Sequence, residues 1–465
     1  MAEDRIVSAS GIRGVVGRGL DPEVVARYAA AFGSFLSRAA DGDATGAVFL
    51  GRDTRTSGPA FVDAAAAGLR AVGRDVRDGG ICPTPSLLLA VGDSDEAAGG
   101  LVLTASHNPP AWNGLKLIGP DGLFLSPEEG RAVQERFEEG PDYASWSGLG
   151  GRGQGSDWTA RHVDRILGLD LVDRDLIAGR GLRVAVDPVG GAGCRALPRL
   201  LRRLGCSVSG INLEPTGRFP REPEPTAEHL GDLGEAVRDS GADVGMAVDP
   251  DADRLSLVNG DGEAVGEDWT LALAVELVLE HRAGPVVTNL STSQVVEDAA
   301  RRHGARTIRA PVGEANVASA MREHDAALGG EGNGGVMLAD LHATRDAPLA
   351  AALVVQLLAE RQRSLGELLA EWPSYHMIRW KGDLPERALE EVYREAEEAA
   401  PDDPEVDRQD GLRLAWPEDG RWVHVRPSGT EPVVRIIAEA PEREQAEELV
   451  AWARHVLRGG RQTAE

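Results

Sequence analysis

The sequence has few cysteines, a large deficit of positive charge and no long apolar segment. Its 465 residues include three cysteines, Cys82, Cys194 and Cys206. They are too few and too scattered for a disulfide framework or a zinc knuckle, so we expect a reducing cytosol. The formal net charge of −26 argues against an extended surface for nucleic acid or an anionic membrane. Any phosphate site must therefore be a local group of arginine, lysine and backbone N–H groups.

Neither the N-terminus nor the interior offers a membrane segment. The first ten residues, MAEDRIVSAS, include acidic side chains and lack the apolar stretch of a signal peptide. The longest apolar stretch, around residues 347–358, is shorter than the roughly 20 residues that span a bilayer. These features predict a cytoplasmic protein with neither a membrane nor a nucleic acid as partner.

One local pattern occurs three times along the chain. A short apolar stretch that reads as a buried strand is followed by a polar loop, a helix, a glycine and a second strand, and these units begin at Ala47, Leu182 and Pro285. This order is typical of βαβ units in a parallel sheet covered by helices. The units are too far apart for a solenoid, so three separate α/β domains of related design are predicted.

The last part of the chain has a different pattern. Residues 371–380 read as a strand, residues 411–416 and 421–425 alternate like half-buried antiparallel strands, and 443–457 reads as a closing helix. We predict three related α/β domains with mixed or parallel sheets and a C-terminal α+β domain, and a glycine-rich linker at 148–156. The predicted domain boundaries are 1–150, 151–260, 261–370 and 371–465.

A serine at the end of a predicted strand is a candidate nucleophile. Ser106 stands in the segment Thr-Ala-Ser-His-Asn-Pro, beside His107 and among small residues. Lys116 follows closely enough in the chain to serve the same site. The alternative is an ordinary turn before two prolines. The segment differs from the G-x-S-x-G elbow of hydrolases, so a lipase or esterase is disfavoured.

Three carboxylates crowd into one short loop after the predicted strand 244–248. Asp249, Asp251 and Asp253 offer hard oxygen ligands to Mg²⁺ or Ca²⁺ and would repel one another without a cation. An EF-hand is excluded, because its sixth position would be Arg254 instead of glycine and a strand precedes the loop. Three ligands leave room for a phosphate oxygen or water, which suits Mg²⁺. A solvated acidic turn is the alternative.

Three further segments carry polar groups between glycines. The segment Arg-Pro-Ser-Gly-Thr-Glu-Pro from Arg426, followed by Arg435, has the hydroxyls, N–H groups and arginines of a phosphate cradle, although a hairpin turn would also explain it. Glu331 and Asn333 lie in a glycine-rich run that could approach sugar hydroxyls or serve as a flexible connector. Arg13, held between glycines, is a weak indication by itself.

A dinucleotide fingerprint also occurs. Gly191 begins a G-x-G-x-x-A segment, and Glu214 follows 23 residues later. Three separate α/β units fit poorly with one Rossmann sheet, so an NAD oxidoreductase is the disfavoured alternative from another class. Histidines outside these segments, such as His162 and His281, are expected at the surface.

Taken together, four of these segments resemble the loops of the α-D-phosphohexomutase superfamily, which contains phosphoglucomutases, phosphomannomutases and phosphoglucosamine mutases. TASHNP resembles its phosphoserine loop, DPDADR its magnesium loop, GGEGNGG its sugar-specificity loop and RPSGTEP its phosphate-binding loop. The resemblance covers essentially the whole chain in the right order. It implies three α/β domains and an α+β domain around a central cleft.

The resemblance also implies roles for individual residues. Ser106 would carry a catalytic phosphate, and one Mg²⁺ per chain would be bound by that phosphoserine, Asp249, Asp251 and Asp253. Phosphate would pass to a hexose phosphate through a bisphosphate intermediate, with a sugar bisphosphate as activator. Arg13, Arg254 and Lys116 would supply positive charge or proton transfer, Lys116 as general acid and base, while His107 supports the loop. The implied substrate-binding residues are Glu331, Asn333, Arg426, Ser428, Gly429, Thr430 and Arg435.

The choice of sugar follows from one loop. Its Asn-Gly-Gly end resembles microbial members that act on glucosamine phosphates or mixed hexose phosphates. We expect conversion of glucosamine 6-phosphate to glucosamine 1-phosphate, by a monomer or homodimer. A phosphoglucomutase/phosphomannomutase is the nearest alternative, and a non-catalytic sugar-phosphate-binding protein is a more distant one. Many relatives have Gly-Arg-Asp where this chain has Thr344-Arg345-Asp346.

Overall fold

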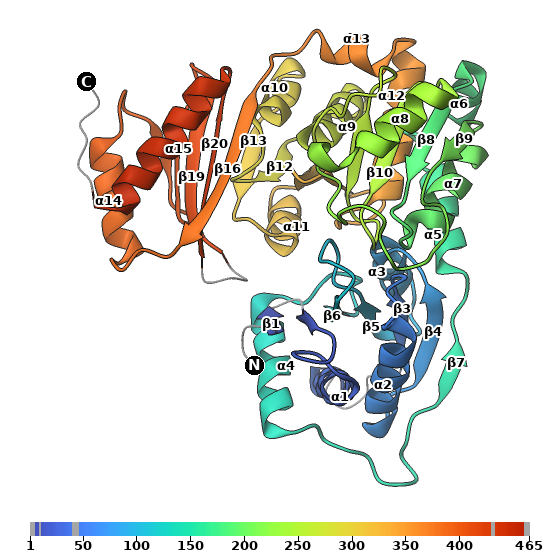
Figure 1. Cartoon of the computed structure of the whole chain (residues 1–465). Coiled ribbons are helices and arrows are strands. Elements are labelled where there is room, and N and C mark those ends of the chain that lie inside the picture. The colour runs from blue at the N-terminus through green and yellow to red at the C-terminus, as the bar shows by residue number, and fades with distance from the viewer. Residues whose placement is uncertain (1–4, 9–10, 40–45, 429–432, 460–465) are drawn as a thin grey trace. The chain divides into compact units, whose positions relative to one another are not determined.

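The computed structural model (Figure 1) describes residues 5–8, 11–39, 46–428 and 433–459, and the chain divides into two compact units. The first unit contains residues 1–270 and 334–366, and the second contains residues 271–333 and 367–465. Each unit is therefore built from two separate stretches of chain. Strands and helices alternate in the order that the sequence predicts, and the predicted α/β fold class with a C-terminal α+β part is confirmed.

A seven-stranded sheet forms the N-terminal part of the first unit, in the order β1-β2-β6-β5-β3-β4-β7. The sheet is mixed, because β3 runs parallel to β4 and β5 whereas β6 runs antiparallel to β5. Its strands are β1 (Arg5–Ser8), β2 (Gly11–Val15), β3 (Ala47–Arg52), β4 (Val76–Ile81), β5 (Ala97–Leu103), β6 (Trp112–Ile118) and β7 (Arg152–Gln154). The helices that follow or connect them are α1 (Pro22–Ala39), α2 (Gly58–Ala71), α3 (Thr84–Gly92) and α4 (Pro127–Glu139).

The two faces of this sheet are buried against different helices. One apolar cluster joins α1, α2 and α4 to the sheet, and a second joins α3 and Trp158 of α5 (Trp158–Leu167) to it. Successive strand residues point to opposite faces. Val48 and Leu50 accordingly belong to the first cluster and Phe49 to the second.

A second sheet in the first unit has the order β11-β10-β8-β9. β10 runs parallel to β8 and antiparallel to β11, and β8 runs parallel to β9. The strands are β8 (Arg183–Asp187), β9 (Ser207–Gly210), β10 (Val244–Val248) and β11 (Leu255–Val258). The other elements are α6 (Arg174–Arg180), α7 (Gly193–Arg203), the short 3₁₀ turn Ala227–His229, α8 (Gly231–Ser240), β15 (Gly335–Leu338) and α12 (Ala347–Arg361).

Helix α12 returns the chain to the first unit and packs against α6 and α7. The carboxylate of Asp346 caps its N-terminus by accepting from the backbone N–H of Leu349 at 2.9 Å, and Pro348 occupies the first turn. The helix ends at Gln362, which has a left-handed φ of 52°. Nearly every side chain of α12 is buried, as expected for a helix that is apolar on all sides.

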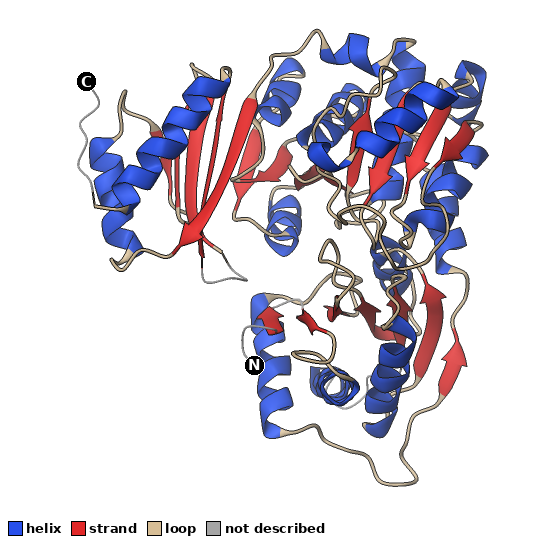
Figure 2. Cartoon of the chain, viewed as in Figure 1, coloured by secondary structure: helices blue, strands red, loops and turns tan. Residues whose placement is uncertain are grey.

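In the second unit, β12 (Val286–Asn289) runs parallel to β13 (Thr307–Ala310) and β14 (Leu328–Glu331). An antiparallel sheet of order β16-β20-β19-β18-β17 follows, with its helices on one face (Figure 2). Its strands are β16 (His376–Asp383), β17 (Glu405–Asp407), β18 (Leu412–Trp416), β19 (Arg421–Pro427) and β20 (Val433–Ala440). Helices α14 (Leu389–Ala399) and α15 (Arg443–Leu457) pack on this sheet. The other helices in this part of the chain are α9 (Asp268–His281), α10 (Gln294–Arg302), α11 (Glu314–Glu323) and α13 (Leu365–Leu369).

The predicted hairpin in this sheet is confirmed, with Trp416 opposite Arg421. The strand predicted at 371–380 is displaced, because β16 begins only at His376. In the described part of the chain, no helix is both long and apolar enough to cross a membrane.

Candidate active site

The loop between β5 and β6 holds Ser106 in a strained conformation. Ser106 is 5% exposed and has a φ of 47°. Such a left-handed conformation costs a residue other than glycine about 1–3 kcal/mol and is often found at functional sites. The backbone N–H of Ser106 donates to Thr104 Oγ1 at 2.9 Å, which helps to keep the loop in this form.

A buried arginine holds the same loop from the neighbouring strand. Arg55 follows β3 and forms an ion pair with Asp53 at 2.9 Å, with both side chains fully buried. Its guanidinium group also donates to four loop carbonyls: those of Ser106 (2.7 Å), Asn108 (2.7 Å), Pro109 (2.6 Å) and Trp112 (2.9 Å). The sequence analysis did not identify Arg55. Its signal was an Asp-Thr-Arg segment directly after a buried strand of the same sheet.

The three predicted metal ligands lie together in the loop after β10. Asp249, Asp251 and Asp253 are buried, and one oxygen of each lies within 4.8 Å of the others. Asp249 Oδ1 accepts from the backbone N–H groups of Asp253 at 3.0 Å and Arg254 at 3.3 Å, so the loop closes on its own first carboxylate. Ser106 Oγ donates to Asp249 Oδ2 at 3.1 Å. The structure thus joins the predicted nucleophile to the predicted metal loop.

The donor set of this loop fits a hard divalent cation. Within the described part of the chain, Asp251 Oδ1 and Asp253 Oδ1 are buried and have no hydrogen-bond partner, although buried polar atoms are normally paired. Burial, and then the nearby charges of Asp253 and Asp251, raise the pKa of Asp249 well above its usual value. Crowded buried carboxylates with unsatisfied oxygens match the oxygen ligands that Mg²⁺ takes.

Cations and a hydroxyl surround the acidic loop. Lys116 Nζ lies 2.8 Å from Asp251 Oδ2 and 3.5 Å from Asp253 Oδ2. Arg345 Nη2 donates to Asp253 Oδ2 at 2.8 Å, and Thr84 Oγ1 donates to Asp251 Oδ2 at 2.6 Å. Burial alone would raise the pKa of Asp251, but the charge of Lys116 and the hydrogen bonds from Lys116 and Thr84 lower it below its usual value. The sequence analysis placed Lys116 here and missed Thr84 and Arg345.

The other predicted residues of the first unit lie around the Ser106 loop. Arg13 Nη1 donates to Asn108 Oδ1 at 3.0 Å. Arg254 is 7% exposed and pairs with Glu224. Burial, and then the charge of Arg254, lower the pKa of His107 to about 3. The imidazole is therefore neutral at pH 7 and adds no positive charge to the site.

In the second unit, Glu331 ends β14 and is 3% exposed. Its Oε1 accepts from Asn289 Nδ2 at 2.8 Å and from the backbone N–H of Gly313 at 3.1 Å. Its Oε2 accepts from Asn333 Nδ2 at 3.4 Å. These contacts fix the orientation of the carboxylate and bring the two predicted sugar-binding side chains together.

Three cations stand side by side on the antiparallel sheet of the second unit. Arg426 on β19 is opposite Arg435 on β20, and Arg435 is opposite Lys381 on β16. Like charges directly opposite one another are unfavourable unless anions lie beside them, and Asp410 already pairs with Arg426 at 2.7 Å. Ser428 follows this row, whereas Gly429 and Thr430 lie outside the described residues.

A chain of hydrogen bonds connects these two parts of the second unit. Asp410 Oδ2 accepts from Arg426 Nε at 2.7 Å and from the backbone N–H of Val312 at 3.1 Å. The next residue, Gly313, donates to Glu331. The predicted sugar loop and phosphate loop are thus linked through one carboxylate.

The predicted site residues fall into two groups. Those brought together in the first unit are Arg13, Ser106, His107, Lys116, Asp249, Asp251, Asp253 and Arg254. Those in the second unit are Glu331, Asn333, Arg426, Ser428 and Arg435.

Four family models match consecutive parts of the chain. They are described as phosphoglucomutase/phosphomannomutase, alpha/beta/alpha domain I (residues 4–144), domain II (160–262), domain III (266–375) and the C-terminal domain (386–455). The domain boundaries drawn from the sequence remain predictions.

Known proteins are similar over almost the whole chain. A probable phosphoglucosamine mutase of Methanopyrus kandleri is 41% identical over 95% of this chain and 95% of its own. A phosphoglucomutase/phosphomannomutase of Thermococcus kodakarensis is 38% identical over 96% of this chain and 97% of its own. Among solved structures, a phosphoglucomutase/phosphomannomutase family protein of Burkholderia thailandensis matches with a TM-score of 0.83 and 29% identity, over 99% of both chains.

Proposed function

The chain belongs to the phosphoglucomutase/phosphomannomutase family of phosphohexomutases, and on this premise we propose how its own residues exchange hexose 1-phosphates and 6-phosphates. Ser106 carries a phosphate in the resting enzyme and gives it to the free hydroxyl of a hexose phosphate. The resulting bisphosphate turns around and returns its other phosphate to Ser106, and a sugar bisphosphate serves as activator. The observation that carries the proposal is the 3.1 Å contact of Ser106 Oγ with a buried cluster of three carboxylates.

Asp249, Asp251 and Asp253 would hold one Mg²⁺ per chain together with the phosphoserine. When bound, Mg²⁺ supplies charge neutralisation to the phosphate during transfer. The buried, unsatisfied oxygens of Asp251 and Asp253 support this ligand set. Asp249 has a second role in the same loop, because its other oxygen holds two backbone N–H groups in place.

In each transfer, the bond from phosphorus to one oxygen breaks as a bond to the other forms. When Ser106 is the donor, the sugar hydroxyl loses a proton, and we assign that proton to Lys116, which accepts it as a neutral amine and gives it to the departing sugar oxygen in the second transfer. Lys116 Nζ lies 2.8 Å from Asp251 Oδ2. Asp251 belongs to the same carboxylate cluster as Asp249, which accepts the hydrogen bond from Ser106. Arg55 and Arg13 act differently, because they hold the loop that carries Ser106 through its carbonyls and Asn108. They keep Ser106 oriented while the phosphate is transferred.

In the second unit, Glu331 and Asn333 bind sugar hydroxyls in this proposal. Arg426, Ser428, Gly429, Thr430 and Arg435 bind the phosphate that does not react. The row of three cations opposite one another supports an anion site there. The hydrogen bonds through Asp410 support joint positioning of sugar and phosphate contacts.

Glucosamine phosphate is the substrate that we propose. The relative from Methanopyrus kandleri carries the name phosphoglucosamine mutase, and the fixed carboxylate of Glu331 could accept from an amino group as well as from a hydroxyl. The name of the second relative favours a phosphoglucomutase/phosphomannomutase, which remains the alternative. A cytoplasmic location and a monomeric or homodimeric state remain predictions.

Phosphorus NMR tests the reaction and the sugar together. The full chain, with Mg²⁺ and a sugar bisphosphate, is given equal concentrations of the 1-phosphates of glucose, mannose, glucosamine and N-acetylglucosamine. We expect 6-phosphates to form, fastest from glucosamine. Ser106→Ala should abolish conversion, whereas Ser145→Ala, at an exposed serine, should not.

Two results would contradict the proposal. Full activity of a folded Ser106→Ala variant would remove Ser106 from the reaction. No conversion of any sugar by the folded, phosphorylated chain would favour a sugar-phosphate-binding protein without turnover.

A further inference from the structure

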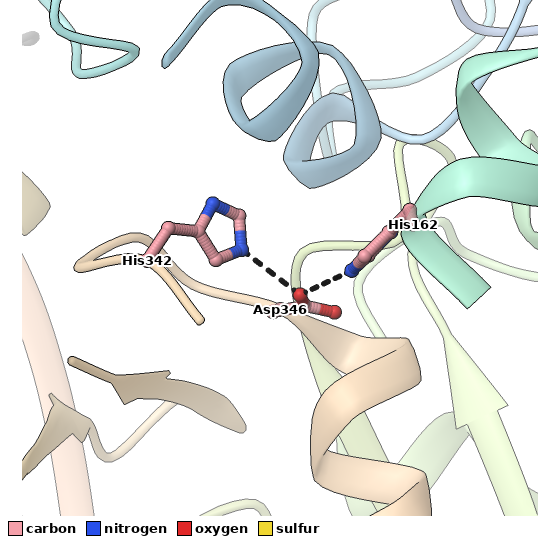
Figure 3. A group of neighbouring side chains, drawn as sticks. All are labelled: His162, His342 and Asp346. Carbon is pink, nitrogen blue, oxygen red and sulfur yellow. Dashed lines mark hydrogen bonds and ion pairs between the residues drawn. The ribbon is translucent and has the colours of Figure 1, made fainter. Parts of the chain in front are cut away.

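A second group of potential metal ligands lies in the first unit, apart from the acidic loop. His162 on α5, His342 before α12 and Asp346 at the start of α12 each place one ligand atom within 4.8 Å of the other two, and Figure 3 shows both rings turned toward the carboxylate. His162 Nε2 and His342 Nε2 lie 2.7 and 3.0 Å from the same atom, Asp346 Oδ2. The expectation that His162 lies at the surface is therefore wrong, because its side chain is fully buried, whereas His281 is exposed as expected.

We propose that His162, His342 and Asp346 bind a transition-metal ion of the Zn²⁺ type. Two imidazole nitrogens and one carboxylate oxygen are a donor set of three-ligand zinc sites, in which water takes the fourth position. Mg²⁺ prefers an octahedron of oxygen ligands. The chain thus offers two cation sites whose ligands select different ions, and this second site goes beyond the mutase reaction.

The surroundings of both rings suit metal binding. Ser86 Oγ lies 2.9 Å from His162 Nδ1, and Thr344 Oγ1 lies closer to Nδ1 of His342, at 2.9 Å, than to its Nε2, at 3.3 Å. A hydroxyl accepts as readily as it donates, so each neutral ring can carry its proton on Nδ1 and turn the lone pair of Nε2 toward a cation. A hydrogen bond from the second nitrogen is the usual support of a metal-binding histidine.

The carboxylate is already held in place for one ligand bond. Asp346 Oδ1 accepts from the backbone N–H of Leu349 at 2.9 Å, which leaves Oδ2 facing the two rings. Ligand atoms on a tetrahedral zinc ion lie about 3.4 Å apart, given bonds of about 2.0–2.1 Å. The present separations of 2.7 and 3.0 Å must therefore widen by only about half an ångström.

His342 is the proposed ligand nearest to solvent. Its side chain is 9% exposed, whereas those of His162 and Asp346 are fully buried. An ion would therefore have to enter the cluster at the His342 ring. Arg345, between Thr344 and Asp346, donates to Asp253 of the acidic loop, so a metal ion here would also steady the turn that carries this arginine.

Titration calorimetry with Zn²⁺ tests the proposal. The full chain is freed of metal with a chelator and then kept in excess Mg²⁺, which occupies the acidic loop. We expect one equivalent of Zn²⁺ per chain. His342→Gln should weaken Zn²⁺ binding by about 100-fold or more, and Thr344→Gly, which removes the supporting hydroxyl with the rest of the Thr344 side chain, by about tenfold. His281→Gln, which changes an exposed histidine on α9, should bind like the original chain.

Further variants separate this site from the acidic loop and from a folding defect. Asp249→Asn should keep the equivalent of Zn²⁺. Zn²⁺ should raise the Tm of the original chain and of His281→Gln but not that of His342→Gln, because an ion that binds only the folded state stabilises it. Thr344→Gly retains all three ligands, so it decides the matter if His342→Gln does not fold.

Three results would overturn the proposal. If His342→Gln folds and binds Zn²⁺ as tightly as the original chain, this ligand set is excluded. If His342→Gln does not fold, undiminished Zn²⁺ binding by Thr344→Gly excludes it. Loss of the Zn²⁺ equivalent in Asp249→Asn would assign it to the acidic loop. No Zn²⁺ binding by the original chain would leave the cluster as a hydrogen-bonded link between α5 and α12.

Discussion

Replacing Arg55 with lysine tests whether the guanidinium group holds Ser106 in its strained conformation. The Arg55 side chain donates five hydrogen bonds, one to Asp53 and four to carbonyls of the Ser106 loop. Lysine keeps the charge but has three N–H donors on a single atom. At least two of the five bonds must therefore be lost, while the buried charge of Asp53 keeps a partner.

The size of the effect follows from these contacts. A hydrogen bond to a charged group contributes about 1.5–3 kcal/mol to the free energy of unfolding. The loss of two such bonds should therefore lower this free energy by about 3–6 kcal/mol. We expect the lower end because water can reach part of the loop. If Ser106 relaxes from its φ of 47°, about 1–3 kcal/mol must be supplied again in the transition state. The value of kcat/KM should then fall about 5- to 150-fold.

Urea unfolding and steady-state kinetics with glucosamine 6-phosphate measure the two effects separately. Arg152→Lys is the matched control, because Arg152 pairs with Asp63 and Asp78, both at 2.7 Å, on the exposed side of β7. An exposed pair contributes about 0–1 kcal/mol, so this variant should remain near the original chain in both measurements. If Arg55→Lys lost the expected stability but kept kcat/KM within twofold, the strain at Ser106 would have no role in the reaction.

Three further predictions concern the metal, the phosphate and protons. Asp251→Asn should raise the Mg²⁺ concentration for half-maximal turnover at least about tenfold by removing a ligand charge, and an unchanged metal dependence would remove that loop from the mechanism. Arg435→Gln should raise KM for the hexose phosphate about tenfold and kcat less, and an unchanged KM would argue against the row of cations as a phosphate site. Burial lowers the pKa of His424 to about 4, against about 6.5 in the unfolded chain. The contribution of the neutral His424 ring to the free energy of unfolding is complete above pH 6.5. It is lost as the pH falls, and the loss reaches about 2 kcal/mol at pH 5. Urea unfolding at pH 7.5 and 5 should show this loss for the original chain and not for His424→Gln, and equal losses would contradict the assignment.

Regular elements could be predicted because their signals are local. The three units that begin at Ala47, Leu182 and Pro285 form the parallel pairs β3–β4, β8–β9 and β12–β13. The predictions were less accurate where glycine or mixed polarity blurs the pattern. The linker predicted at 148–156 contains β7, which pairs with β4 at the sheet edge, and the strand predicted at 371–380 begins at His376.

The site was only partly predictable, because its contacts join distant residues. Ser106 and Asp249 each follow a strand and could be found from neighbouring residues, but their hydrogen bond spans 143 positions. Thr84 opens an apolar helix and reveals its role only through Asp251, 167 positions away. His162 looked like a surface residue because its partner, Asp346, lies 184 positions further along the chain.

The return of residues 334–366 to the first unit has a consequence for biosynthesis. Arg345 and Asp346 make their contacts with Asp253 and His162 only after the ribosome has added the 76 residues from 271 to 346. At about 5–20 residues per second, this takes about 4–15 seconds. During that interval the nascent chain carries the acidic loop without the arginine that pairs with it, and residues 271–333 emerge before their own unit is complete. We expect chaperones to meet the nascent chain in this interval, and a slower ribosome to prolong it.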